Sequence, residues 1–258
     1  MPDALFVADG DLFVPTEWGR SPWSPESLHG GPPAALVVRA AEQAVAGADP
    51  PMQLVRLTLE LLRPVPLVPL AVATEVVRPG RKVQLVGVTV SAAGSDVLRG
   101  LVLFVRQAAV DAPFPPPEPP PPRPDSSVTP LSGVAWTAFH SHGVEMRVAA
   151  GGMERGPATV WFRLRCPVVA GEEPSGAMRA AAAGDFSNGI SAVLPFEEYL
   201  FINPDLTMVL NREPVGEWVC LEATTHLGRA GAGMAESALY DDRGRVGRAL
   251  QTLLVDVR

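Results

Sequence analysis

The chain has 258 residues, of which 47% are hydrophobic and 19% charged, and its formal net charge at pH 7 is −7. This length suits one large domain or two small ones, with ample apolar material for a core. The negative charge argues against a nucleic-acid groove, which needs clustered Lys and Arg, and against anionic membrane surfaces. The start lacks a basic stretch followed by a long apolar run, and no apolar run approaches the length of a membrane span, so we expect neither a signal peptide nor a membrane span.

The cysteines and histidines indicate no metal site. Cys166 and Cys220 lack the spacing of metal ligands, which predicts a cytoplasmic protein with two reduced, buried thiols. His140 and His142 have an alternate spacing that could hold a metal, but no further ligand cluster accompanies them. We therefore expect these two histidines to face solvent.

The first half of the chain predicts one helix followed by strands. An Ala-rich stretch from Ala34 to Val45 comes directly after Pro32 and Pro33 and ends before Gly47, and this is typical helix punctuation. Runs rich in Val and Leu follow, separated by Pro or Gly turns, of which Arg78-Pro79-Gly80-Arg81 suits a hairpin. The expected strands are Leu54–Leu62, Leu70–Val77, Val83–Ser91 and Val97–Arg106.

A proline-rich segment from Pro113 to Pro124 interrupts the chain. Such a run favours an extended polyproline helix and makes a semi-rigid linker. We therefore predict an N-terminal unit over residues 1–110, a linker over 111–130 and a C-terminal unit over 131–258. A ligand for an SH3 or WW domain is the alternative interpretation of the proline run.

The second half predicts a similar order of elements, with an Ala-rich helix near Ser175–Ala183 that the glycine-rich segment 184–189 ends. The turn Asp241-Asp242-Arg243-Gly244 fits a hairpin loop. Expected strands are Val144–Val148, Thr159–Leu164, Tyr199–Asn211, Glu217–Leu227, Gly233–Tyr240 and Val246–Val257. One helix beside a run of antiparallel strands, twice over, is an α+β fold rather than a doubly wound nucleotide-binding fold.

Two blocks of the first half reappear in the second half at one constant offset. Leu57–Arg63 reads against Leu206–Arg212, and Val97–Leu101 reads against Val246–Leu250, in each case 149 residues later. A shared offset indicates one architecture built twice, each copy too small to bury a generous core alone.

The two copies differ in polarity at three aligned positions. At the offset of 149 residues, Arg56 aligns with Asp205, Val76 aligns with Thr225, and Val102 aligns with Gln251. The second copy thus has a carboxylate, a hydroxyl and an amide where the first has a cation and two valines. A polar triple in one copy predicts a single active site in a doubled scaffold.

Seven segments in order along the chain carry a resemblance to a known family. They are Leu28-His29-Gly30-Gly31-Pro32, Arg63-Pro64-Val65-Pro66, Arg78-Pro79-Gly80-Arg81, Gly184-Asp185-Phe186-Ser187-Asn188-Gly189, Asn203-Pro204-Asp205-Leu206-Thr207, Gly216-Glu217-Trp218 and Gly247-Arg248-Ala249-Leu250-Gln251. On these segments the chain resembles the acyl-CoA thioesterase II (TesB-like) family. The resemblance implies an α+β double hotdog: two tandem hotdog repeats, each with a central helix wrapped by an antiparallel sheet, pairing into one continuous sheet.

The resemblance also implies a catalytic set of Asp, Thr or Ser, and Gln in the C-terminal hotdog. Matched by motif, these residues are Asp205, Thr225 and Gln251. Thr224 is an alternative to Thr225, because neighbouring strand residues point to opposite faces. Donors for the oxyanion are expected near the start of a hotdog helix, from Gly30 and Gly31 or from the segment 184–189.

The chemistry that follows is hydrolysis of acyl-CoA to a free fatty acid and CoA. Asp205 would accept a proton from the attacking water, and Thr225 and Gln251 would orient that water. On this hypothesis Asp205→Asn loses most of the rate. We expect no metal or cofactor, since the thioester is already activated. The candidate substrate-binding residues are His29, Gly30, Gly31, Arg78 and Arg81; an ordinary cap-adjacent role for His29 and an ordinary charged hairpin for the two arginines are the alternatives.

Two other functions compete with hydrolysis. A hotdog hydratase has a motif resembling Asp-x-Asn-Pro-x-His, and here Phe201 and Leu206 fill the Asp and His positions around Asn203-Pro204. A non-catalytic module that binds acyl-CoA is the second alternative. The two halves could pair internally and leave a monomer, or sheet edges could join into a homo-oligomer.

Overall fold

The computed structural model describes residues 3–127, 134–152 and 156–258. The first half contains β1 (Phe6–Asp9), β2 (Leu12–Pro15), a short 3₁₀ turn (Glu17–Gly19), α1 (Gly31–Val45), β3 (Met52–Leu61), β4 (Leu70–Arg78), β5 (Val83–Ala92) and β6 (Ser95–Arg106). The second half contains a π-helical turn (Phe139–Gly143), β7 (Val144–Ala150), β8 (Ala158–Leu164), α2 (Gly176–Gly184), α3 (Ser187–Ile190), β9 (Tyr199–Ile202), β10 (Asp205–Leu210), β11 (Trp218–Leu227), β12 (Ala232–Asp241) and β13 (Gly244–Val257).

The described strands form one antiparallel sheet in which the two halves mirror each other. The sheet has 13 strands in the order β1-β2-β4-β5-β6-β3-β10-β13-β12-β11-β8-β7, with β9 added on β13. The halves join where β3 pairs with β10, and Leu57 there lies opposite Met208. The predicted double hotdog with one continuous sheet is confirmed.

The strand positions also confirm the repeat. Moving β5 (Val83–Ala92) by 149 residues gives the bounds of β12 (Ala232–Asp241), and moving the start of β6 by the same amount gives the start of β13. Both copies alternate buried residues with less buried ones along much of these strands, as expected for a sheet with one face on the core.

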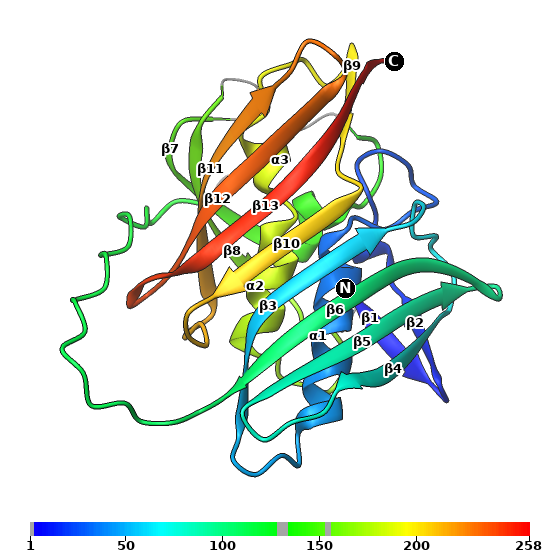
Figure 1. The fold of residues 1–258 in the computed structure, drawn as a ribbon. Coiled ribbons are helices and arrows are strands. Elements are labelled where there is room, and N and C mark those ends of the chain that lie inside the picture. The colour runs from blue at the N-terminus through cyan, green and yellow to red at the C-terminus, as the bar shows by residue number, and fades with distance from the viewer. Residues whose placement is uncertain (1–2, 128–133, 153–155) are drawn as a thin grey trace.

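The two long helices lie side by side against one face of the curved sheet (Figure 1). Gly31 makes this close packing feasible, because a Cβ there would lie 2.5 Å from the carbonyl oxygen of Ala182 in α2. Pro32 and Pro33 follow in the first turn of α1, where a missing N–H costs nothing. The start of α1 is therefore held against the end of α2.

Two expectations about local structure need correction. The strand predicted over Tyr199–Asn211 is two strands, β9 and β10, separated at Asn203-Pro204, since proline cannot donate to a ladder. The helix predicted from Ala34 begins at Gly31. The predicted boundary between residues 130 and 131 lies outside the described residues.

The proline-rich segment runs along the outside of the C-terminal half (Figure 1). Arg123 donates to Asp242, and its guanidinium lies 5.1 Å from the Trp218 ring centroid. Glu118 accepts from Arg245 and from Tyr240. These contacts fasten the segment to the β12–β13 hairpin and the outer face of β11.

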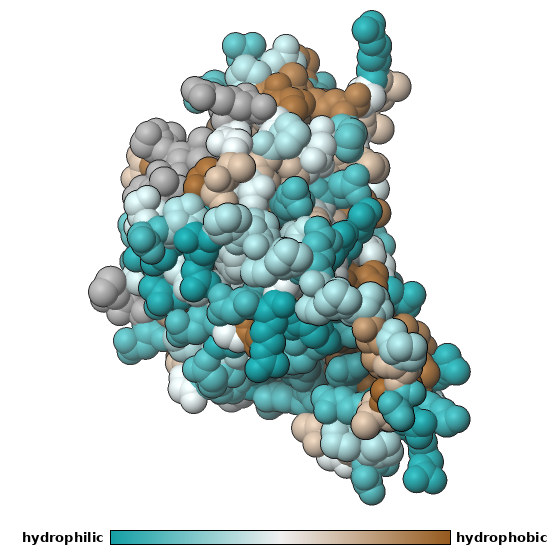
Figure 2. Space-filling view, turned by 90° about the vertical axis from the view of Figure 1, so that its left-hand side faces the viewer, coloured by the Kyte–Doolittle hydropathy of each residue, from teal (hydrophilic) through white to brown (hydrophobic). Residues whose placement is uncertain are grey.

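The surface in Figure 2 is mainly hydrophilic, as expected for a chain with a net charge of −7. Hydrophilic side chains predominate on the face shown in Figure 2, and apolar atoms there are confined to small areas. In the part of the chain that the structure describes, no helix is both long and apolar enough to cross a membrane.

Candidate active site

Two cavities meet between the helices and β9. A groove of about 580 Å³ opens along one side, and a smaller chamber of about 60 Å³ lies deeper. Four residues line both: Trp23, His29, Asp185 and Asn188. They form the junction, where a ligand in the groove would reach the chamber. Binding clefts are typically apolar with a few convergent polar groups; the two cavities are mostly apolar, and their polar groups converge at the junction.

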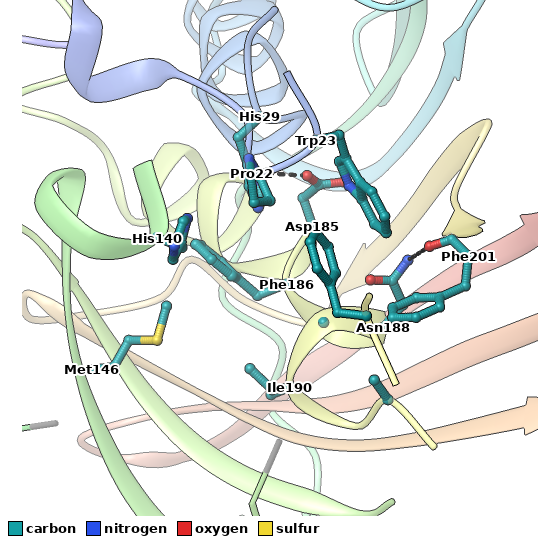
Figure 3. A pocket seen from close by; sticks show the side chains of 13 residues that line it. Pro22, Trp23, His29, His140, Met146, Asp185, Phe186, Asn188, Ile190 and Phe201 are labelled. Carbon is teal, nitrogen blue, oxygen red and sulfur yellow. Dashed lines mark hydrogen bonds and ion pairs between the residues drawn. The ribbon is translucent and has the colours of Figure 1, made fainter. Parts of the chain in front are cut away.

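Asp185 is the carboxylate at this junction, and both of its oxygens are held. Its Oδ2 lies 2.8 Å from His29 Nδ1, and its Oδ1 accepts from Asn203 Nδ2 at 2.8 Å and from Gln251 Nε2 at 3.2 Å. Figure 3 shows Asp185 directed at His29 above the chamber. These three partners come from three separate segments, so the fold fixes the plane of the carboxylate.

Glycine allows Asp185 to lie this close to the start of α1. A Cβ on Gly30 would lie 2.7 Å from Asp185 Oδ2 and 2.8 Å from Oδ1, too close for any side chain. Gly30 is the N-cap of α1, so the positive end of the helix dipole faces the carboxylate.

His29 Nδ1 has a second neighbour, the N–H of Gly31 at 3.1 Å. One ring nitrogen carries either a proton or a lone pair. With the proton on Nδ1, His29 donates to Asp185; with the proton on Asp185, both Asp185 and Gly31 donate to Nδ1. This contact joins the first half of the chain to the second.

Gln251 binds Asp185 from the inner face of the sheet. It is fully buried in β13, and its Oε1 accepts from the N–H of Asn188 at 3.1 Å. Its Nε2 also lies 3.2 Å from the carbonyl oxygen of Asp185. Both the oxygen and the nitrogen of this amide thus bind the segment that carries Asp185 and Asn188, as a buried amide requires.

Thr225 lies on the same inner face, in one row with Gln251. The β11–β12–β13 register places Thr225 opposite Ala235 and Ala235 opposite Gln251. The neighbouring Thr224 lies opposite Glu236, on the outer face. Of the two threonines, Thr225 is the one directed inward.

The Thr225 hydroxyl belongs to a buried network that holds α3. Ser191 Oγ lies 2.7 Å from Thr225 Oγ1 and donates to the carbonyl oxygen of Ser187 at 2.8 Å. Because Ser191 has a single hydroxyl proton, Thr225 is the donor in their contact. Ser237 of β12 donates to Ser187 Oγ at 2.8 Å. Together these hydroxyls fix α3, which follows Asp185 directly.

Asp205 does not join this cluster, which corrects the expected triple. Along its strand, buried side chains alternate with more exposed ones, and Leu206 and Met208 are fully buried. Asp205 therefore faces the outside of the sheet. There its Oδ1 accepts from the backbone N–H of Thr252 at 2.7 Å and from the Thr252 hydroxyl at 2.6 Å. Asp205 is a capping carboxylate on the face opposite Gln251.

The predicted ligand-binding residues also separate. His29 and Gly30 line the groove, whereas Arg78 ends β4 and Arg81 lies in the turn between β4 and β5. Leu61, which lines the groove, and Val90 of β5 both lie opposite Leu98 of β6. The β4–β5 turn comes before Val83, seven residues earlier along β5. Seven residues of strand correspond to about 23 Å, so the turn is at the far end of the sheet. The arginine that lines the groove is Arg63.

The candidate oxyanion donors lie at both cavities. Gly30 lines the groove and Gly189 lines the chamber. The N–H of Gly31 is directed at His29, and that of Asn188 at Gln251. Both segments named from the sequence thus contribute glycines to the candidate site.

The histidine pair differs from expectation. His140 is buried and lines the chamber, because the π-helical turn directs it inward, whereas His142 is exposed. Among the residues that the structure describes, no group of three His, Cys, Asp or Glu side chains could hold a metal ion.

Neither cysteine is a candidate nucleophile. Burial raises the pKa of the Cys166 thiol to about 11, and it raises the pKa of the Cys220 thiol as well. Both are unpaired, and Cys166 is only half-buried rather than fully buried as expected. A thiol that is protonated at neutral pH is a poor nucleophile.

The sequence contains a signal for Asp185. At the same offset of 149 residues, Asp185 aligns with Leu36, so a polar residue of the second copy again corresponds to an aliphatic residue of the first. This pair lies outside the strands, with Leu36 in α1 and Asp185 at the C-cap of α2. The alternation of apolar residues after Asp205 also indicated that Asp205 faces outward.

Comparison with known proteins connects both halves to one family. The family model for the acyl-CoA thioesterase N-terminal domain matches residues 19–105, and that for the C-terminal domain matches residues 109–255. A search of curated proteins finds no match.

Solved structures share the whole fold. A hotdog protein of unknown function from Alicyclobacillus acidocaldarius is 17% identical with a TM-score of 0.70, over 99% of this chain and 97% of that one. Acyl-CoA thioesterase II TesB2 from Mycobacterium marinum is 16% identical with a TM-score of 0.66, over 90% and 92%. The tesB protein of Mycobacterium avium subsp. paratuberculosis is 16% identical with a TM-score of 0.67, over 97% and 95%.

At these identities the structural likeness establishes the fold alone. The family models reach further, since the C-terminal match by itself covers more than half of the chain and the N-terminal match covers most of the rest. The chain therefore belongs to the acyl-CoA thioesterase family and is a thioester hydrolase.

Proposed function

We propose that the protein hydrolyses acyl-CoA at the junction of the groove and the chamber, with Asp185 as the general base. The observation that carries this proposal is the carboxylate of Asp185, which borders both cavities and is held at both oxygens by His29, Asn203 and Gln251. Fixed partners orient a catalytic group before the substrate arrives.

In the proposed reaction the thioester carbonyl lies at the junction. Asp185 accepts a proton from water as the water oxygen attacks the carbonyl carbon. The C–S bond then breaks, and the proton passes from Asp185 to the departing sulfur. General base catalysis of this kind contributes about 10²–10⁴-fold.

Gln251 and Thr225 act as positioning residues in this scheme. Gln251 is fully buried and binds Asp185 directly, and Thr225 braces α3 through Ser191. The residues that the sequence suggested would orient water are thus proposed to orient the base and its neighbours.

The groove would take the CoA portion of the substrate. Its volume of about 580 Å³ suits an elongated ligand, and Arg63 at its wall offers a guanidinium for phosphate oxygens. We therefore assign to Arg63 the phosphate contact that the sequence suggested for Arg78 and Arg81.

The test is release of free thiol from acyl-CoA by the purified chain and by Arg63→Ala. We expect Arg63→Ala to raise KM for acyl-CoA about tenfold, with kcat little changed, because the phosphates are remote from the reacting bond. Arg78→Ala is the matched control, and its KM should equal that of the unmodified chain. Absence of thiol release across short, medium and long acyl groups would instead identify a binding module.

A further inference from the structure

The chamber beyond Asp185 is small, about 60 Å³, and partly open to the surface. Its walls are mostly apolar and include Met146, Phe186, Ile190, Ala192 and Phe201, all at least nine-tenths buried. Figure 3 shows Met146 and Ile190 at the end of the chamber away from His29 and Asp185. A chain that enters past Asp185 therefore meets Met146 and Ile190 after a short distance.

The volume sets a limit on what the chamber can hold. A dry apolar cavity of about 150 Å³ accommodates benzene, with six carbons. The chamber has less than half of that volume. A well-packed protein interior does not widen without cost, because overpacking forces side chains out of their preferred rotamers.

We propose that the chamber receives the acyl group and restricts it to about two to four carbons. The proposal rests on the proposed function, since it takes the thioester to lie at the junction. It makes the protein a short-chain acyl-CoA thioesterase, with Met146 and Ile190 as the residues that set the length limit.

The limit gives a specific dependence on chain length. Each methylene that enters an apolar site contributes about fourfold in kcat/KM, equal to about 0.8 kcal/mol. From acetyl-CoA to butanoyl-CoA the value should therefore rise by about 15-fold. From hexanoyl-CoA onward it should fall, because the chamber is full.

Gly189 offers a variant that narrows the chamber without a clash. It lines the chamber, and a Cβ there would have no heavy atom within 4 Å. Gly189→Ala also suits a helix better than glycine does. We expect this variant to lower the butanoyl-to-acetyl ratio of kcat/KM at least fivefold. Gly47→Ala is the matched control, because a Cβ at Gly47 also has nothing within 4 Å and Gly47 lies beyond the far end of α1.

Met146→Ala should have the opposite effect. Shortening this side chain lengthens the chamber and should raise the hexanoyl-to-butanoyl ratio of kcat/KM at least fivefold. Met234→Ala is the matched control, since Met234 is 38% exposed and lies on the outer face of β12. If Met146→Ala fails to fold, Gly189→Ala still tests the proposal.

The experiment measures thiol release from a series of straight-chain acyl-CoA substrates, from acetyl to palmitoyl, for the unmodified chain and these variants. A maximum at butanoyl-CoA or below, moved in opposite directions by Gly189→Ala and Met146→Ala, is the expected result. A maximum at octanoyl-CoA or beyond, or ratios in Gly189→Ala equal to those in Gly47→Ala, would overturn the length limit while leaving hydrolysis intact. No release from any substrate would instead refute the proposed function.

Discussion

His29 of the first half and Asp185 of the second half lie 2.8 Å apart, Nδ1 to Oδ2. The contact forms where the start of α1 meets the end of α2, so the candidate base is completed by a residue from the other repeat. Although the polar triple of the sequence lies wholly in the C-terminal half, the site that the fold assembles uses both halves.

His29→Ala should lower kcat by about 10²-fold, because the Asp185 carboxylate loses one of its fixed partners and small displacements at a reacting centre cost about that much. The comparison is kcat and its pH profile for this variant against His226→Ala, an exposed histidine on the outer face. A merely structural role for His29 would leave the shape of the pH profile unchanged, and a normal kcat would remove His29 from the site.

Gly30→Ala should inactivate the enzyme without unfolding it. The new methyl would lie 2.7 Å from Asp185 Oδ2, so the carboxylate must move away from the junction. Gly47→Ala adds the same methyl in open space and should retain full activity. Thiol release and melting temperature of both variants provide the check, and equal activity of the two would contradict the placement of Asp185.

Thr225→Val should destabilise the protein by about 1 kcal/mol, because Ser191 loses its hydroxyl donor and a buried hydrogen bond contributes about that much. The activity should fall as α3 loosens. Thr224→Val removes a hydroxyl on the outer face and should change neither quantity. Denaturant unfolding of both variants separates the threonines, and an effect confined to Thr224→Val would reverse their assigned roles.

Glu42 should make stability depend on pH. Burial raises the pKa of Glu42 to about 7, although the hydrogen bond from Ser175 lowers it; the negative charge of Glu213 raises it further. The folded pKa lies above the unfolded value of 4.5, so the stabilisation that Glu42 gives is complete below pH 4.5 and is lost as pH rises through 7.

Glu42→Gln should therefore melt at a higher temperature than the unmodified chain at pH 8, with a much smaller difference at pH 5. The amide retains an acceptor for Ser175, so the hydrogen bond survives the change. Glu75→Gln, at an exposed strand position, should behave like the unmodified chain at both pH values. Equal melting temperatures of Glu42→Gln and the unmodified chain at pH 8 would show that ionisation of Glu42 does not destabilise the fold.

The fold was predictable from the sequence because strand spacing and turn residues repeat at one offset, and the sheet of 13 strands preserves that offset. The candidate site was only partly predictable. Gln251 and Thr225 differ between the copies and lie on the inner face. Asp185, however, acquires its partners from His29 and Asn203, which are distant in sequence, and strand comparison does not reveal contacts between helix ends.

The placement of His140 was wrong for a related reason. Its alternate spacing with His142 suggested two side chains on one exposed surface, but the π-helical turn over Phe139–Gly143 separates them. A π-helical turn has no simple sequence signature, so the direction of His140 depended on the fold around it.

We propose Asp185, and not Asp205, as the base. The most direct measurement is kcat/KM for thiol release from butanoyl-CoA by Asp185→Asn and Asp205→Asn, each checked for an unchanged melting temperature. We expect a loss of about 10²–10⁴-fold in Asp185→Asn, because an amide cannot accept the proton, and near-normal activity in Asp205→Asn. Full activity in Asp185→Asn together with loss in Asp205→Asn would contradict the account.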